Sequence, residues 1–143
     1  TMDAGNGNGA IRVLIVENNS VLQRGLSRLL EYEDDIRVCG IADSASSALG
    51  LAAEARPDMV IVDVSRGVDD GIGLVREIAA KRPGLPVIVL AMHDEFLFAR
   101  RALRAGARGY VSAQEAPGAI VRAIRHVIAG SEFVSDSVAH RVV

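Results

Sequence analysis

The chain has 143 residues and a net charge of −2, and half of its residues are hydrophobic. This length suits one domain, and the composition is that of a folded protein. No apolar run approaches the roughly 20 residues that span a bilayer. The single cysteine, Cys39, excludes an internal disulfide. Residues 1–10 lack the basic and apolar segments of a signal peptide, so we expect a flexible leader or cloning remnant on a cytoplasmic protein.

Charge is distributed unevenly along the chain. Residues 1–95 carry a net charge of −6, whereas residues 96–143 carry +4. Nearly all basic residues are arginine, and Lys81 is the only lysine. The basic half is either a solvated helix surface or a polar interaction surface. No block of like charge is dense enough to predict that this chain binds DNA by itself.

Short apolar runs rich in β-branched residues predict buried strands. These runs occupy residues 11–16, 37–42, 59–62, 87–90 and 109–111. Such continuous apolar strands are typical of a parallel sheet that is covered on both faces.

Each predicted strand is followed by a stretch with helical periodicity. Ser20 is expected to cap the first helix, and Asp43 or Ser44 the second. The third helix is expected to break at Pro83, the fourth to run from about Glu95 to Ala105, and the fifth to run from Pro117 to Gly130. The result is a doubly wound α/β domain over residues 11–130, with a tail of no clear period over residues 131–143.

In such folds the ligand site lies beyond the carboxyl ends of the strands. The loops there are 17–20, 63–71, 91–94 and 112–115. Asp63 ends the third strand, and Glu17 with Asn18 ends the first, so their oxygen atoms are expected to converge on a hard cation such as Mg²⁺. A carboxylate in that setting can take a phosphoryl group as an aspartyl phosphate. The alternative is that Asp63 only caps a loop.

Other sites are less well supported by the sequence. A dinucleotide site needs G-x-G-x-x-G directly after the first strand, whereas the glycine-rich segment 5–9 precedes that strand. There is no G-x-S-x-G nucleophile motif. His93 follows the fourth strand without a nucleophile to serve, and we expect it to be a solvent-exposed loop residue. We therefore expect no enzyme activity, and a small enzyme is the least favoured hypothesis.

Two segments resemble the receiver domain of bacterial response regulators. PDMVIVDVSRGVDDGIGLVREI contains Asp63 and Gly71 in the D-x₇-G spacing of that family, and ALRAGARGYV is similar to regulators of the NarL/FixJ type, which carry a LuxR-like DNA-binding domain. The similarity covers about residues 11–130. It implies a flavodoxin-like (βα)₅ fold with a five-stranded parallel sheet in the order 2-1-3-4-5.

The same resemblance implies roles for particular residues. Asp63 occupies the phosphoacceptor position, and Tyr110 the position of the aromatic switch residue. Glu17, Asn18, Asp63 and, weakly, Ser65 occupy the positions that hold Mg²⁺.

The sequence also departs from the family pattern at four positions. Asn18 stands where a second acidic residue is usual, Ala91 replaces a Ser or Thr, Ala113 replaces a Lys, and Gly67 replaces a Pro. A lost hydrogen bond to a charged group is worth about 1.5–3 kcal/mol, and a full conformational switch needs about 5 kcal/mol of bias. We therefore expect Mg²⁺ to be held less tightly and phosphorylation to be weakened, as in a degenerate receiver.

Aromatic residues near this region have two interpretations each. Tyr110 either belongs to the switch or is a half-buried packing residue with its hydroxyl in water. Of Phe96 and Phe98, at most one can face the core, because residues two apart on a helix point in different directions.

Arginines of the fourth and fifth predicted helices mark a surface through which the resembling family meets partners. They form either such an interface or a solvated basic face: Arg100, Arg101, Arg104, Arg122 and Arg125. The resemblance implies a sensor histidine kinase as partner, a homodimer through the receiver surface, DNA binding only through a C-terminal domain outside this chain, and no membrane.

Two functional hypotheses remain beside the enzyme. The first is the receiver domain of a LuxR-type regulator that accepts a phosphoryl group at Asp63. The second is a phosphorylation-independent module that dimerises or docks a partner. Metal binding and phosphoryl uptake distinguish them.

Overall fold

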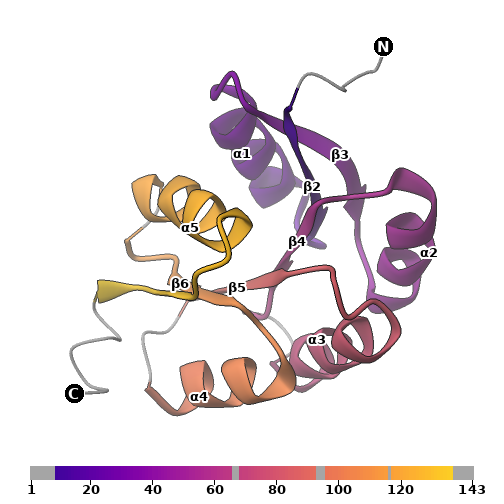
Figure 1. Cartoon of the computed structure of the whole chain (residues 1–143), viewed down its shortest axis with the longest axis vertical. Helices are drawn as coiled ribbons and strands as arrows, with labels where there is room; N and C mark the ends of the chain where they lie inside the picture. The colour runs from indigo at the N-terminus through magenta and orange to yellow at the C-terminus, as the bar shows by residue number, and fades with distance from the viewer. Residues whose placement is uncertain (1–8, 66–67, 93–95, 116, 137–143) are drawn as a thin grey trace.

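The computed structural model describes residues 9–65, 68–92, 96–115 and 117–136. Within them a parallel sheet has the order β3-β2-β4-β5-β6-β7 (Figure 1). The strands are β2 (Ile11–Val16), β3 (Ile36–Ala42), β4 (Met59–Asp63), β5 (Val87–Ala91), β6 (Gly109–Ser112) and β7 (Phe133–Val134). The first five follow the order 2-1-3-4-5 that the sequence predicted, so the flavodoxin-like fold class is confirmed.

Within the described residues, five helices connect and cover the strands. They are α1 (Ser20–Glu31), α2 (Ala45–Ala55), α3 (Val68–Lys81), α4 (Phe96–Ala105) and α5 (Gly118–Ile128). Figure 1 shows α1 and α5 on one face of the sheet and α2, α3 and α4 on the other. No helix in the described ranges is long and apolar enough to cross a membrane.

The core has two layers because successive strand residues point to opposite faces of the sheet. Leu14, Val62 and Val89 pack in the layer under α2, α3 and α4. Ile15 and Ile61 pack in the layer under α1 and α5. The same alternation fixes the direction of side chains at the strand ends, where the candidate site lies.

The prediction of five strands was one too few. Phe133 and Val134 add β7 in parallel beside β6, with the pairs Gly109–Phe133 and Tyr110–Val134. Two residues are too few to show a strand period, so the sequence carried no pattern for this strand. Main-chain bonding to the open edge of β6 determines it.

The cap of α1 also differs from the prediction. Asn19, and not Ser20, is the N-cap: its backbone is extended, and its Oδ1 accepts from the N–H of Leu22 at 3.0 Å. Ser20 already belongs to the helix. Both residue types are good caps, so the sequence alone did not separate them. The prediction of Ser44 as one of two caps for α2 is confirmed, because its Oγ accepts from Ser47 N–H at 3.2 Å.

Candidate functional site

The sheet brings Glu17 and Asp63 together at its carboxyl edge. Val16 of β2 is paired with Val62 of β4, and each carboxylate follows one of these paired residues. By strand alternation both side chains point to the face covered by α1 and α5. The predicted convergence of these two carboxyl groups is thus a consequence of the register.

Glu17 is buried, with 4% of its surface exposed. Its Oε2 accepts from the N–H of Asn19 at 3.0 Å. Its Oε1 is buried without a hydrogen-bond partner among the described residues. Burial, and next the neighbouring Asp63 carboxyl, raise the pKa of Glu17 to about 7. Two ionised carboxylates so close together repel each other. The pair therefore favours the binding of either a proton or a cation.

Asp63 is half-buried at the end of β4. Its Oδ1 accepts from the N–H of Ser65 at 2.8 Å, which orients the carboxyl group in a tight turn. Asn18 is exposed beside them. The loop after Asp63 is described only in part, and Gly67 lies outside the described residues.

Three residues at this edge carry oxygen ligands suited to Mg²⁺. Glu17 and Asp63 supply two carboxylates, Asn18 supplies an amide, and Mg²⁺ accepts one or two carboxylates together with waters. The Oε1 of Glu17 has no hydrogen-bond partner among the described residues, and either a proton or a cation would satisfy it. No group of three or more His, Cys, Asp or Glu side chains suited to a metal occurs in the described ranges. The two carboxylates and the amide are of the oxygen-ligand type that Mg²⁺ accepts.

The positions expected to read phosphorylation hold alanines. Ala91 ends β5 and is paired with Ser112, and Ala113 donates its N–H to the carbonyl of Ala91 at 2.7 Å. Ala91 packs in the layer under α2, α3 and α4, whereas Ala113 packs on the α1 and α5 side, where Asp63 also points. These two side chains supply neither a hydroxyl nor an ammonium group to Asp63.

Tyr110 is fully buried in the layer under α2, α3 and α4. The alternative of a half-buried ring with its hydroxyl in water is therefore wrong, because the whole side chain is buried. Phe98 packs against the same layer and Phe96 does not, in agreement with the prediction that at most one of them faces the core. His93 lies outside the described residues.

The sequence analysis included Ser112 in a candidate loop but did not predict its contact with Ser135; both serines are fully buried. The Oγ of Ser135 accepts from the N–H of Ser112 at 2.7 Å. A hydroxyl in a short polar segment gives no periodic signal, so this contact between β6 and the tail was not predictable.

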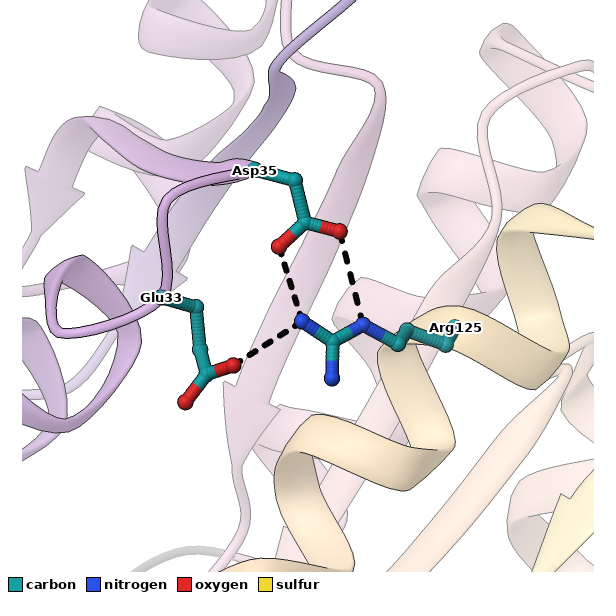
Figure 2. A network of polar contacts seen from close by, with 3 residues as sticks. All are labelled: Glu33, Asp35 and Arg125. Carbon is teal, nitrogen blue, oxygen red and sulfur yellow. Dashed lines mark hydrogen bonds and ion pairs between the residues drawn. The ribbon is translucent and has the colours of Figure 1, made fainter.

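Of the five arginines predicted at an interface, Arg125 is bonded within the chain. Figure 2 shows its guanidinium between Asp35, at 2.8 Å, and Glu33, at 2.9 Å, both from the turn that precedes β3. The hydrogen bond from Arg125 lowers the pKa of Asp35. Arg122 lies over the Phe133 ring at 6.0 Å, and Arg100 over the Phe96 ring at 5.6 Å. All five arginines are exposed: Arg100, Arg101, Arg104, Arg122 and Arg125.

An open pocket of about 500 Å³ lies at the opposite edge of the sheet, before β4 and β5. It is lined by Pro57, Asp58, Lys81, Arg82, Gly84 and Leu85. None of the predicted site residues lines it, so the strand-end chemistry and this pocket are separate.

Comparison with known proteins identifies a family. A family model described as the response regulator receiver domain matches residues 13–125. Response regulator GacA of Pseudomonas viridiflava is 33% identical over 132 residues, which are 92% of this chain and 62% of that protein. The chain thus spans about three-fifths of the length of this relative.

Solved structures share the fold. The crystal structure of a two-component response regulator of the LuxR family from Aurantimonas sp. SI85-9A1 has a TM-score of 0.88 and 29% identity, over 93% of this chain and 95% of that one. The isolated REC domain of RcsB from Salmonella enterica serovar Typhimurium, solved with the phosphomimetic BeF3−, has a TM-score of 0.82 and 24% identity, over 92% of this chain and 97% of that one. The second likeness bears on the fold alone.

Proposed function

The chain belongs to the response regulator receiver domain family, and we propose that it is the signal-input domain of a LuxR-type two-component regulator with Asp63 as phosphoacceptor. The observation that carries this proposal is the contact of Asp63 with the buried Glu17, whose Oε1 lacks a hydrogen-bond partner within the described residues. Such a pair of carboxyl groups at the carboxyl edge of a parallel sheet suits the capture of a cation and a phosphoryl group.

The chemistry rests on the Asp63 carboxylate. One of its oxygens attacks the phosphorus of the donor, the bond from phosphorus to the leaving group breaks, and the leaving group departs with the electron pair. The product is an acyl phosphate on Asp63. Glu17, Asp63 and the Asn18 amide would hold Mg²⁺. When bound, Mg²⁺ would neutralise negative charge on the phosphoryl oxygens.

The same site explains why we propose weakened phosphorylation. Asn18 contributes no charge toward the cation, and Ala113 contributes no ammonium group toward the phosphoryl oxygens. Glu17 must release a proton before it can bind a cation, because its pKa is raised to about 7. Each of these three features weakens the binding of the cation or of the phosphoryl group but leaves the Asp63 nucleophile in place.

A phosphorylation-independent docking module is the second candidate. It is favoured by the alanines at positions 91 and 113, which supply neither a hydroxyl nor an ammonium group to a phosphoryl group on Asp63. In this alternative the domain has one conformation and acts through a constant surface.

The wider setting follows from the family. We propose that residues 11–130 form the receiver unit, that a sensor histidine kinase in the cytoplasm is the phosphoryl donor, and that DNA is bound only by a separate C-terminal domain. The surface that carries the arginines of α4 and α5 is proposed as the homodimer contact. Receiver domains act in signalling, and we propose no enzymatic turnover of a substrate by this chain.

The test is the intact mass of the full chain after incubation with Mg²⁺ and acetyl phosphate. We expect slow gain of one phosphoryl group by the natural chain and none by Asp63→Asn. Asp43→Asn is the matched control, because Asp43 is an exposed carboxylate that follows β3 at the same edge. Equal labelling of all three chains would contradict the assignment. Absence of labelling with both acetyl phosphate and histidine kinases would favour the docking module.

A further inference from the structure

The segment Ser131–Asp136, here called the strap, is bonded along the outer edge of β6. Figure 1 shows β7, the strand within it, beside β6 at the end of the sheet. The N–H of Phe133 donates to the carbonyl of Arg108 at 3.1 Å, and the N–H of Ser135 donates to the carbonyl of Tyr110 at 3.0 Å. Phe133 and Ser135 thus pair with the main chain at residues 108–110, whereas the N–H of Ser131 donates to the carbonyl of His126 on α5.

Side chains anchor the strap on both faces of the sheet. The Phe133 ring lies 5.5 Å from the ring of His126 and 6.0 Å from the guanidinium of Arg122, both on α5. Val134 packs against the opposite core layer, under α4. Two neighbouring residues thus fix the strap from two sides, which is more than an unstructured tail would show.

The end of the strap is bonded to the loop that follows β6. Fully buried Ser135 accepts from the N–H of Ser112 at 2.7 Å, and the N–H of Asp136 donates to Glu115 Oε1 at 3.2 Å. Ser112 is the last residue of β6, and Glu115 lies in the loop that follows it. A buried N–H that loses its acceptor is costly, so the loop and the strap favour each other's present conformation.

Main-chain hydrogen bonds continue from this loop toward Asp63. The N–H of Ala113 donates to the carbonyl of Ala91, and the N–H of Val64 donates to the carbonyl of Leu90. Leu90 is the register partner of Asp63. The connection uses main-chain groups and the Ser135 hydroxyl. It does not depend on the side chains that are absent at positions 91 and 113.

We propose that the strap is the element through which this domain transmits the state of Asp63 to the chain beyond Asp136. The proposal deepens the function proposed above and rests on it. Adjacency alone does not establish coupling. Coupling requires that the state of the Asp63 site alters the strap, and this effect can be measured by hydrogen exchange.

The experiment is amide hydrogen exchange of the full chain, read by mass spectrometry over peptides that cover residues 108–115 and 131–136. In Ser135→Ala we expect exchange at residues 112–115 to be about tenfold faster or more, because the buried N–H of Ser112 loses its acceptor. Ser131→Ala is the matched control: Ser131 is an exposed serine of the same segment. Glu115→Ala provides a second variant that loosens the strap without changing a buried residue.

The second arm adds BeF3− with Mg²⁺. We expect it to change exchange in the strap of the natural chain, to do nothing in Asp63→Asn, and to have a smaller effect in Ser135→Ala. Altered peptides around Glu17 and Asp63 with an unchanged strap would overturn the proposal. If BeF3− leaves even the peptides around Glu17 and Asp63 unchanged, the phosphoacceptor assignment fails. In that case the link between strap and loop is still tested by comparing hydrogen exchange in Ser135→Ala and Ser131→Ala. Unchanged exchange at residues 112–115 in Ser135→Ala would refute the link.

Discussion

Glu17 and Asp63 come from the ends of two neighbouring strands, and their carboxyl groups meet at the carboxyl edge of the sheet. Burial and this contact raise the pKa of Glu17 to about 7. Glu17 therefore carries a proton over part of the pH range in which the unfolded chain would be ionised there. The first two predictions follow from this pair.

The contribution of Glu17 to the free energy of unfolding should fall as the pH rises from 4.5 to about 7 and then level off. The folded state holds the Glu17 proton more tightly than the unfolded chain does, so fewer protons are bound after unfolding in this window and the slope is negative. Urea titrations of the natural chain and of Glu17→Gln at several pH values measure the effect. The difference between the two curves isolates Glu17, and a flat difference would contradict the raised pKa.

Asn18→Asp should tighten Mg²⁺ binding by roughly tenfold or more, since a third carboxylate joins the edge. Asn18 is exposed, so the substitution leaves the core intact. Binding should also strengthen as the pH rises through 7, because Mg²⁺ competes with the Glu17 proton. Calorimetric titration with Mg²⁺ measures both effects. Asn18→Ala serves as control, and equal affinities for the two variants would show that position 18 does not face the cation.

Asn19→Ala should lower the free energy of unfolding by about 1 kcal/mol, because the first turn of α1 loses the oxygen that caps Leu22 N–H. Ser20→Ala should have little effect, since Ser20 lies inside the helix. Urea denaturation of the two variants under the same conditions compares them. The reverse order would mean that Ser20 caps the helix after all.

Gly71→Ala should destabilise the fold by about 1–3 kcal/mol. A Cβ at position 71 would collide with Val64 Cγ1 and lie 3.1 Å from Val64 Cβ. Gly73→Ala is the matched control on the same helix, where nothing lies within 4 Å of the new Cβ, and it should stabilise α3 by about 0.5–1 kcal/mol. Thermal unfolding of both variants tests the pair. If Gly71→Ala were stabilised as well as Gly73→Ala, the Val64 side chain would have moved aside without a cost in stability.

The sequence was sufficient wherever a pattern repeats. The apolar run at 11–16 has the same bounds as β2, and the run at 87–90 is one residue shorter than β5. Strand order and the meeting of Glu17 with Asp63 followed from the rule that parallel strands end at one edge. The close approach of Gly71 to Val64 gives the physical reason for the D-x₇-G spacing, which the sequence showed only as a motif.

The contacts that could not be predicted are isolated ones between residues far apart in the sequence. Arg125 is bonded to Asp35, 90 residues away, and Ser135 to Ser112, 23 residues away. Neither contact has a period or a local partner in the sequence. The burial of Glu17 could not be predicted for a related reason. A charged residue at a strand end is usually solvated, and its burial here depends on how the helices pack around it.

The complete burial of Tyr110 has a spectroscopic consequence. The chain has no tryptophan and two tyrosines, so its intrinsic fluorescence comes from Tyr110 and Tyr32 alone. Tyr32 is 86% exposed and Tyr110 is 0% exposed. Acrylamide should quench the first and spare the second. Replacement of Tyr32 by phenylalanine would leave one phenol in the protein, whose emission reports any rearrangement of the β6 region without an added label.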